Sequence, residues 1–375
     1  MSLRVSSAFD GGNGALVDAP DDNTVCVQLS RDAGDRFMQW FYFRVTGAGG
    51  RDLTVRIVNA RDVSYARGYV DYRAVASRDR KTWRRVETSF EDGELVVRYP
   101  AAPDSVYFAY FVPYSMERHA DRVAGYARDP RVALEVVGST LDGQDLDLVR
   151  FGRGPRVIWA IARQHPGETM AEHFMDGFVD RLLDEHDAVS ARLHEAATFF
   201  VVPNMNPDGS RRGYLRTNAS GANLNREWLE PTLERSPEVH AIRERMRTTG
   251  VDLCLDVHGE EELPYNFIAG PDGIPGLTTS QVELLRSFRA SLARLNPDFQ
   301  TERGYPPAAR GDANLTMCTN WVAENFGCLA MTLEQPFKDA ANRPMPDVGW
   351  CPERARRLAA STVDAIASVV DVLRR

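Results

Sequence analysis

The pattern of apolar residues changes near residue 120, and this change limits the chain to two architectures in succession. Before it, short runs alternate apolar and polar residues, and turn-forming segments such as "GAGG" and "AAPD" separate them. Alternation with a period of two is typical of strands that bury one face. The first part is therefore predicted to be an antiparallel β-sandwich of about 115 residues. Its predicted strands are 39–45, 52–58, 68–77, 93–100 and 105–114.

Beyond residue 120, four short runs are continuously apolar: "PRVIWAIA", "ATFFVVPN", "VDLCLDV" and "GCLAMTLE". Such runs are typical of strands that are buried on both faces of a largely parallel sheet. The second part is therefore predicted to be α/β, with a mixed, mainly parallel sheet flanked by helices. We expect two domains, at 1–120 and 121–375. Helical periodicity predicts helices at 169–186, 236–249, 278–295 and 352–375.

The charge of the chain excludes some classes of partner. A formal net charge of −8 argues against nucleic acid and against a membrane surface, because such proteins usually carry a basic excess. No segment approaches the length of a membrane span, and the first twenty residues lack the apolar block of a signal peptide. We therefore expect a cytoplasmic protein. Lysine occurs only at Lys81 and Lys338, which indicates a GC-rich, bacterial gene.

Polar residues follow each of the four continuously apolar runs. They are "RQHPGE" after the first, "PNMNPDG" after the second, "HGEEE" after the third and Glu334 at the end of the fourth. Ligands of open α/β sheets bind outside the carboxyl ends of the strands. We therefore expect these residues to meet at one edge of the sheet and to form the functional site.

His165 and Glu168 lie three positions apart and flank a Pro-Gly pair where a helix is predicted to begin. A His-x-x-Glu pair alone is more often a surface or capping feature than a metal site. Here its position at a strand end favours a metal. A catalytic zinc needs three protein ligands and one open position, and His258 is the best candidate for the third ligand. The five cysteines are scattered without a C-x-x-C pair, so we do not expect thiolate ligands.

Four motifs in order carry a resemblance to a known family: "HPGE", "NMNPDGSRRGYLRTNASGANLNREW", "DVHG" and "MTLE". Together they resemble the zinc metallocarboxypeptidases, and the upstream "QWFYFRV" and "YFAYFVPYS" resemble their cytosolic carboxypeptidase branch. The resemblance covers roughly residues 38 to 370. It implies a carboxypeptidase-like fold, one zinc ion per chain, and hydrolysis of the C-terminal bond of peptides or proteins.

The resemblance assigns the metal and the base. His165, Glu168 and His258 would bind zinc, which lowers the pKa of water and polarises the scissile carbonyl group. Glu334 would be the general base that takes a proton from water and passes it to the leaving amine. A carboxylate directly after an apolar strand is also hard to explain as an ordinary surface residue.

The resemblance also assigns three residues to the substrate. Asn225 and Arg226 would capture the terminal carboxylate, since a guanidinium group offers two parallel donors to a carboxylate. Arg216 would polarise the substrate carbonyl group and stabilise the oxyanion. These assignments describe an exopeptidase.

The chain departs from the family pattern at two points. Asn223 stands where the family usually has an aspartate that accepts a hydrogen bond from His165, and its amide brings no negative charge. We therefore expect weaker zinc binding. The digestive branch uses a tyrosine in a loop before the catalytic glutamate, and "RGDANLTMCTNWVAENFG" contains none. Tyr305, just upstream, is a candidate for that position.

Specificity depends on the pocket for the terminal residue. A terminal Glu or Asp needs a buried cation, and Arg303, Arg310 and Lys338 lie near the segments expected to line the pocket. We expect a preference for acidic C-terminal residues, which the cytosolic branch is associated with removing. Two alternatives stay open. One is a zinc amidohydrolase of the aspartoacylase type, acting on small N-acyl amino acids, and the other is a non-catalytic interaction protein with a degenerate peptidase domain.

Overall fold

Two five-stranded sheets form the N-terminal part of the computed structural model, which describes residues 2–373. One sheet has the order β1-β4-β10-β6-β7 and the other the order β2-β3-β5-β9-β8. All neighbouring strands are antiparallel except β3 and β5, which are parallel. The bounds are β1 (Arg4–Ser6), β2 (Ala15–Asp18), β3 (Thr24–Gln28), β4 (Tyr42–Thr46), β5 (Leu53–Ile57), β6 (Val75–Ser77), β7 (Arg84–Arg85), β8 (Glu87–Glu91), β9 (Glu94–Tyr99) and β10 (Ser105–Ala109).

The alternation in the sequence explains how these sheets pack. In β5 the side chains of Leu53, Val55 and Ile57 are buried, whereas those between them are partly exposed. They share one hydrophobic core with Phe43 and Phe108 of the other sheet. The predicted β-sandwich is therefore confirmed.

One predicted strand is mostly wrong. The segment 68–77 was expected to be extended throughout, but a short 3₁₀ helix covers Ala66–Tyr69 and only Val75–Ser77 forms a strand. Asp71 has a φ of +57°, which a β-strand cannot accommodate. The chain turns there, and Tyr69 and Tyr72 pack into an aromatic cluster with Tyr110.

A seven-stranded mixed sheet follows, in the order β11-β12-β14-β13-β15-β17-β16. The four strands predicted from apolar runs, β13, β14, β15 and β17, are the parallel centre of this sheet. Antiparallel strands that were not predicted extend it on both sides. The bounds are β11 (Ala133–Ser139), β12 (Asp145–Gly152), β13 (Arg156–Ala162), β14 (Ala197–Val202), β15 (Leu253–Val257), β16 (Phe267–Ala269) and β17 (Leu329–Glu334).

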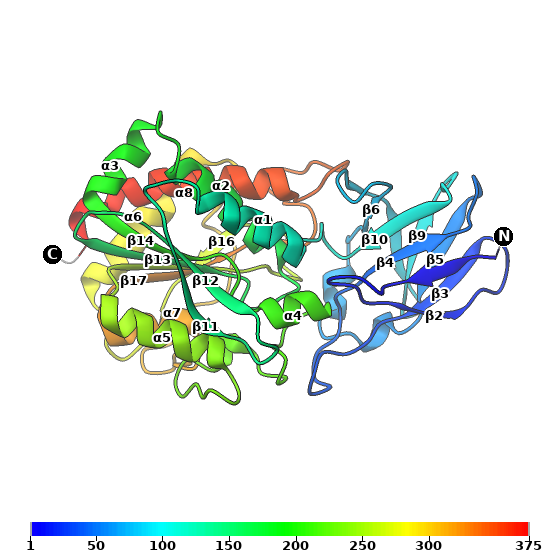
Figure 1. Cartoon of the computed structure of the whole chain (residues 1–375), viewed down its shortest axis with the longest axis horizontal. Helices are drawn as coiled ribbons and strands as arrows, with labels where there is room; N and C mark the ends of the chain where they lie inside the picture. Colours follow the sequence, from blue (N-terminus) through cyan, green and yellow to red (C-terminus); the bar gives the residue numbers. More distant parts are fainter. Residues whose placement is uncertain (1, 374–375) are drawn as a thin grey trace.

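Helices cover both faces of this sheet, which is why its central strands are apolar throughout. Ile158 of β13 packs in one core with residues of α2, α3, α6 and α8, and its neighbour Trp159 packs in a second core with residues of α5 and α7. Helices α2 and α8 lie side by side (Figure 1). The bounds are α1 (Met116–Tyr126), α2 (Thr169–Leu182), α3 (Ala188–Ala196), α4 (Pro207–Arg212), α5 (Pro237–Thr249), α6 (Thr279–Leu295), α7 (Cys318–Phe326) and α8 (Pro352–Val369).

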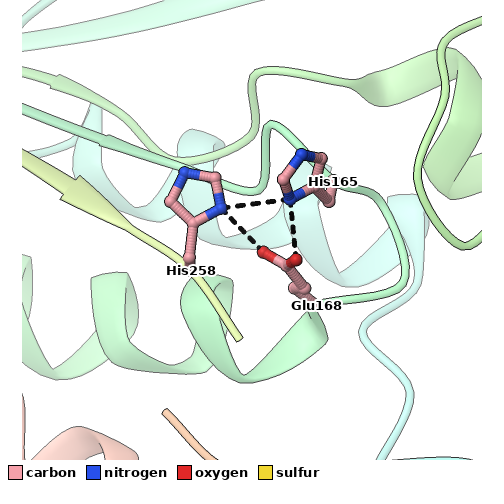
Figure 2. Close-up of side chains that lie close together, drawn as sticks. All are labelled: His165, Glu168 and His258. Carbon is pink, nitrogen blue, oxygen red and sulfur yellow. Dashed lines mark hydrogen bonds and ion pairs between the residues drawn. The ribbon is translucent and has the colours of Figure 1, made fainter. Parts of the chain in front are cut away.

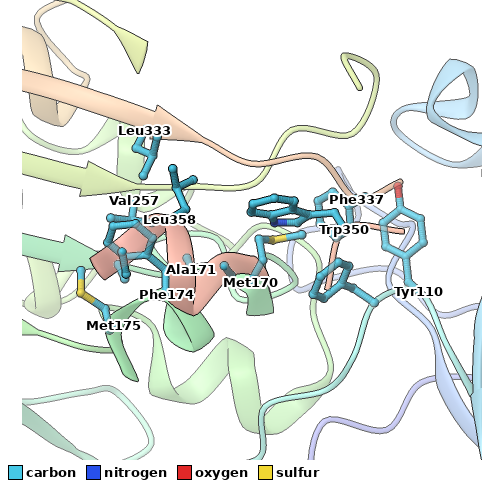
Figure 3. Close-up of a cluster of buried hydrophobic side chains, with 14 of the residues drawn as sticks. Tyr110, Met170, Ala171, Phe174, Met175, Val257, Leu333, Phe337, Trp350 and Leu358 are labelled. Atoms are coloured by element: carbon cyan, nitrogen blue, oxygen red, sulfur yellow. The ribbon is translucent and has the colours of Figure 1, made fainter. Parts of the chain in front are cut away.

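The two parts of the chain share an apolar junction. The ring of Tyr110, just after β10, stacks on Phe337, just after β17, with ring centroids 4.5 Å apart. Figure 3 shows this pair beside Trp350 and Met170, in a cluster that continues toward α2. The predicted boundary at residue 120 falls inside α1, so we propose that the second domain begins at Ser115, which caps that helix.

Three residues lie outside the described part of the chain. They are residue 1 and residues 374–375, which the predicted domains include, and the last two also belong to the predicted C-terminal helix. Among the helices of residues 2–373, none combines the length and the apolar character that crossing a membrane requires.

Candidate active site

The polar residues that follow the parallel strands meet at one edge of the sheet. His165 follows β13 and His258 follows β15, and these two strands are hydrogen-bonded neighbours. Glu334 is the last residue of β17, which pairs with the other side of β15. Glu168 immediately precedes α2. The sheet therefore brings together residues that lie far apart in the sequence.

His165, Glu168 and His258 form a buried cluster (Figure 2). The Nδ1 atom of His165 lies 2.7 Å from Glu168 Oε1, and the Nδ1 atom of His258 lies 2.9 Å from Glu168 Oε2. The two Nδ1 atoms are 3.2 Å apart. Three ligand atoms therefore point toward one another from two segments of the chain, the loop between β13 and α2 and the position just after β15.

The other nitrogen of His165 is held by Asn223. Its Nε2 atom lies 3.0 Å from Asn223 Oδ1, which also accepts a hydrogen bond from the backbone N–H of Asn225 at 3.1 Å. Because the Asn225 N–H can only donate, the Asn223 atom that faces it must be the oxygen. His165 Nε2 is then the protonated nitrogen, and the lone pair of Nδ1 is free for a metal.

Asp256 holds His258 in the same way. Its Oδ2 atom lies 2.9 Å from His258 Nε2 and accepts a hydrogen bond from Gln164 Nε2 at 2.7 Å. This arrangement directs Nδ1 of His258 toward Glu168, as in carboxylate–histidine–metal triads. Asp256 was not predicted from the sequence as part of the site. Its signal was a carboxylate inside an otherwise apolar run, "LCLDV".

The charges of the cluster suit a cation. Burial, aided by the charge of Arg216, lowers the pKa of His165 to about 4, so this imidazole is neutral at pH 7. Burial alone would raise the pKa of Glu168, but the two imidazoles outweigh it and lower that pKa, so the carboxylate is ionised. Burial opposes protonation of His258, yet the charges of Asp256 and Glu168 raise its pKa. The same negative charges would stabilise a divalent cation.

The donor set fits zinc. Two imidazole nitrogens and one carboxylate oxygen are a common ligand set of catalytic zinc sites, in which the fourth position stays open. All three ligand atoms lie within 4.8 Å of one another, and each imidazole is oriented by a hydrogen bond on its far side. Proteins with this arrangement bind the metal through deprotonated donors.

Arg216 lies beside this cluster. Its Nη1 atom is 3.8 Å from Glu168 Oε1 and 3.7 Å from Glu261 Oε1. Burial raises the pKa of Glu261 to about 8, and no hydrogen bond reaches its Oε1 atom within residues 2–373. Glu261 was not assigned from the sequence, although it belongs to the run "HGEEE" after the predicted ligand.

Glu334 keeps one carboxylate oxygen without a partner. Its Oε1 atom accepts a hydrogen bond from the hydroxyl of Tyr305 at 3.2 Å, and its buried Oε2 atom has no partner in the described part of the chain. Burial raises its pKa, as do the charges of Glu168 and two further glutamates, whereas His258 lowers it. The Tyr305 hydroxyl has one proton, which it shares between Glu334 Oε1 and the nearer Glu260 Oε2. Such a carboxylate can accept a proton.

Asn225 and Arg226 belong to the short 3₁₀ helix Leu224–Arg226, and Arg226 Nη1 donates to the carbonyl oxygen of Asn225 at 2.6 Å. Asn225 Oδ1 accepts from the backbone N–H of Cys318 at 2.8 Å, and its Nδ2 atom has a single long contact, 3.5 Å to His258 Nε2. Arg226 is exposed, and no carboxylate among residues 2–373 pairs with it. Burial of part of the side chain lowers the pKa of its guanidinium group, and the charge of Arg216 lowers it further. Arg226 can therefore bind an anion from outside the chain.

A cavity of about 780 Å³ opens beside Glu334. Thr319 and Thr332 contribute to its wall, and their hydroxyl oxygens are 2.7 Å apart. Of the three cations considered for specificity, Arg303 lines this cavity, whereas Arg310 hydrogen-bonds to Pro275 O and Lys338 to Val70 O.

Arg289 also lines this cavity, and it was not predicted from the sequence. Its Nε atom is buried without a hydrogen-bond partner in residues 2–373. No local sequence signal distinguished this arginine, because the side chain reaches the cavity from the middle of α6.

Two family models match the chain. Residues 125–346 match the zinc carboxypeptidase family, and residues 5–111 match the N-terminal domain of cytosolic carboxypeptidases. An uncharacterised protein of Zymomonas mobilis is 48% identical over 373 residues, which cover all of this chain and 98% of that protein.

Solved structures of full-length relatives agree with the fold. A metallo-carboxypeptidase from Burkholderia cenocepacia has a TM-score of 0.96 at 41% identity, covering 99% of this chain and all of that one. A metallo-carboxypeptidase from Pseudomonas aeruginosa, in complex with (2-guanidinoethylmercapto)succinic acid, has a TM-score of 0.95 at 42% identity, with the same coverage. The chain therefore belongs to the zinc carboxypeptidase family and carries the N-terminal domain of its cytosolic carboxypeptidase branch.

Proposed function

We propose that this protein is a zinc-dependent metallocarboxypeptidase that hydrolyses the C-terminal bond of peptides or proteins. One observation carries the proposal. Glu334, with a carboxylate oxygen that has no partner in residues 2–373, ends β17 beside His258, whose backbone N–H donates to the carbonyl oxygen of Leu333 at 2.8 Å. A general base therefore adjoins a donor set that fits a catalytic metal.

We assign one zinc ion per chain to His165, Glu168 and His258. The metal supplies Lewis-acid chemistry, since it polarises a carbonyl oxygen and lowers the pKa of water. The protein orients the donors through Asn223 and Asp256. Glu168 contributes the one negative charge among the three ligands.

Glu334 acts as the general base in this proposal. Its raised pKa makes its carboxylate a better proton acceptor than an exposed one, and the protonated form can then deliver the proton to the leaving amine. The Tyr305 hydroxyl orients the carboxylate through Oε1 and leaves Oε2 for the water. Burial and the neighbouring carboxylates raise the pKa of Tyr305, so it remains a donor.

Arg216, Asn225 and Arg226 bind the substrate. Arg216 stabilises the charge that develops on the carbonyl oxygen, because its guanidinium group lies near the metal ligands and is largely buried. Arg226 pairs with the terminal carboxylate, because it is exposed and lacks an acidic partner in residues 2–373. Asn225 donates from Nδ2 to the same carboxylate.

We also propose a preference for acidic C-terminal residues. Arg289 and Arg303 are the two cationic side chains that line the cavity beside Glu334, whose wall also carries Asp272, Glu302 and Asp312. The buried Nε of Arg289 still needs an acceptor. The ligand of the Pseudomonas aeruginosa structure combines a succinate with a guanidine group. Peptides that end in arginine are therefore the strongest competing substrates to test. A cytoplasmic location is part of the proposal, in line with the description of the N-terminal domain family.

The test compares one peptide with a free and with an amidated C-terminus, using the zinc-loaded enzyme. Amidation removes the charge and leaves Arg226 without its partner, so we expect at least a roughly 10- to 100-fold lower kcat/KM. A matched series of peptides that end in Glu, Asp, Arg, Lys or Leu then measures the preference for the C-terminal residue. Equal cleavage of free and amidated peptides, or hydrolysis confined to N-acyl amino acids, would overturn the carboxypeptidase proposal.

A further inference from the structure

The loop that carries Arg216 has no regular structure of its own. It begins at Gly213, which ends α4 in a left-handed conformation, and it runs to the short helix that starts at Leu224. A loop of this kind does not fix a side chain by itself. The position of Arg216 must therefore come from contacts with other parts of the chain.

Asp32 of the N-terminal β-sandwich supplies such contacts. Its Oδ1 atom accepts a hydrogen bond from the backbone N–H of Leu215 at 2.8 Å. Its Oδ2 atom accepts from the backbone N–H groups of Arg216 at 2.7 Å and Thr217 at 3.0 Å. One carboxylate therefore binds three successive N–H groups centred on Arg216.

The Asp32 side chain is itself held in place. It is 2% exposed, and a turn fixes its backbone through hydrogen bonds from Asp32 N to Phe37 O and from Asp35 N to Asp32 O. Burial raises the pKa of Asp32 to about 6, although the backbone donors of the loop act in the opposite direction. The group is therefore an ionised acceptor at pH 8.

The same domain also contacts the guanidinium group of Arg216. The group lies over the rings of Tyr65 and Phe37, at 5.2 and 5.8 Å from their centroids. The side chain of Gln39 fixes the backbone of Tyr65 with two hydrogen bonds. Its Oε1 atom accepts from Tyr65 N at 2.8 Å, and its Nε2 atom donates to Tyr65 O at 3.1 Å. Gln39 is the glutamine of "QWFYF".

The loop continues the connection to the metal cluster. The carbonyl oxygen of Leu215 accepts a hydrogen bond from the backbone N–H of Gly167 at 2.9 Å. Gly167 lies between His165 and Glu168, and a side chain there would come within 2.9 Å of that carbonyl oxygen. The hydrogen bonds from Asp32 to Leu215 and from Leu215 to Gly167 therefore connect Asp32 to the backbone beside the proposed zinc ligands.

We infer that Asp32 is a positioning residue for Arg216, so that the N-terminal β-sandwich completes the proposed oxyanion-binding side of the active site. The inference rests on the proposed role of Arg216. Asp32 does not touch the substrate. It holds the backbone, while Tyr65 and Phe37 limit where the guanidinium group can lie.

The principal test is Asp32→Asn in the full-length zinc-loaded enzyme at pH 8. An amide offers one oxygen and one NH2 group, so either Leu215 or the pair Arg216 and Thr217 would face a donor in place of an acceptor. We expect kcat to fall about 10- to 100-fold, the cost of a small misplacement of a catalytic group. KM should change by less than about three-fold, since Arg226 is untouched. Asp35→Asn, in the same turn but exposed, is the matched control and should leave kcat unchanged.

A double-mutant cycle with Arg216→Ala separates positioning from general stability. If Asp32 acts through Arg216, Asp32→Asn should lower kcat by less than about two-fold once Arg216 is gone. The same fold loss in both backgrounds, or a wild-type kcat in Asp32→Asn, would overturn the inference. Full activity of Arg216→Ala would instead overturn the role proposed for Arg216, whatever Asp32→Asn does.

Tyr65→Leu, combined with Arg216→Ala, gives a second double-mutant cycle that does not depend on whether Asp32→Asn folds. Tyr65 is only partly buried, so this variant keeps the core intact. We expect a kcat loss of about 3- to 10-fold that disappears in the Arg216→Ala background. An equal loss in both backgrounds contradicts the proposal that the N-terminal domain positions the guanidinium group. Zinc content should stay at one ion per chain in every variant.

Discussion

The side-chain oxygen Oδ1 of Asn223 accepts a hydrogen bond from His165 Nε2 at 3.0 Å. The bond fixes the orientation of the imidazole without adding a negative charge, whereas the corresponding contact of His258 is made by the carboxylate of Asp256. The two histidines of the proposed zinc site are therefore oriented by partners of different charge. A charged partner makes an imidazole a stronger ligand.

Asn223→Asp should therefore tighten zinc binding, by about ten-fold within the range known for such partners. The new carboxylate can still accept from His165 and from the Asn225 N–H, so the geometry is preserved. Competition with a chromogenic chelator measures the Kd. Asn342→Asp, at an exposed position, adds the same charge away from the site and is the control. An unchanged Kd would show that the charge of this partner does not tune the metal.

Glu334→Gln tests the proposed base. The amide keeps the size of the side chain and cannot accept a proton, so kcat should fall by about 10²- to 10⁴-fold while zinc remains bound. Glu302→Gln, an exposed glutamate that lines the same cavity, should stay within about two-fold of the wild type in a kcat assay. Near wild-type turnover of Glu334→Gln would remove this residue from the mechanism.

Tyr305→Phe should shift the pH profile. The Tyr305 hydroxyl donates to Glu334 Oε1, which stabilises the ionised carboxylate and holds its pKa down. Loss of this bond raises the pKa of Glu334, so the acidic limb of the kcat/KM profile should move to higher pH. A shift to lower pH, or an unchanged profile, would mean that the hydrogen bond does not control the base.

Replacing Arg289 is the clearest test of the proposed preference for acidic C-terminal residues. Arg289→Gln removes one of the two arginine charges from the cavity but keeps a polar side chain, so kcat/KM for peptides ending in Glu should fall by about ten-fold or more. The value for the same peptide ending in Leu should change little. Arg310→Gln, whose parent arginine lies outside this cavity, is the matched control. Equal losses for both peptides would assign Arg289 a structural role.

The sequence predicted the parallel strands and identified the residues proposed as metal ligands because both follow from local patterns. Continuous apolar runs mark strands buried on two faces, and the ligands directly follow such runs. Strand β11 was missed because it lies at the edge of the sheet with no fully buried residue, so it lacks the continuous apolar run that marks the central strands. Helix α4 has only six residues, too few for a periodic signal.

The remaining parts of the site depend on tertiary contacts that no local pattern contains. Asp32 meets Leu215 across 183 positions of sequence, and its segment reads as an ordinary polar turn. The cation–aromatic contact of Arg216 with Tyr65 likewise requires the two domains to be docked. Sequence motifs found the residues proposed to contact the metal and substrate, and the structure was needed to find what holds them.

The last prediction concerns the pH dependence of stability at the start of the second domain. His119 of α1 is buried, with Nδ1 2.6 Å from Glu172 Oε1 and Nε2 3.2 Å from Asp147 Oδ2. Burial opposes its protonation, but the two carboxylates outweigh burial and raise its pKa to about 9. The imidazolium form is therefore the one that the fold stabilises.

Between pH 6.5 and 9 the folded protein binds a proton at His119 that the unfolded chain has released, so stability must fall as the pH rises. The stabilisation of the fold by protonated His119 is fully present below pH 6.5, the ordinary pKa of histidine, and is lost as the pH passes 9. Its size is on the order of 3 kcal/mol. Urea unfolding at several pH values should show this decline in the wild type, and His119→Gln should lack it. A difference in unfolding free energy between the two proteins that stays constant from pH 6.5 to 9.5 would contradict the ionised state assigned to His119.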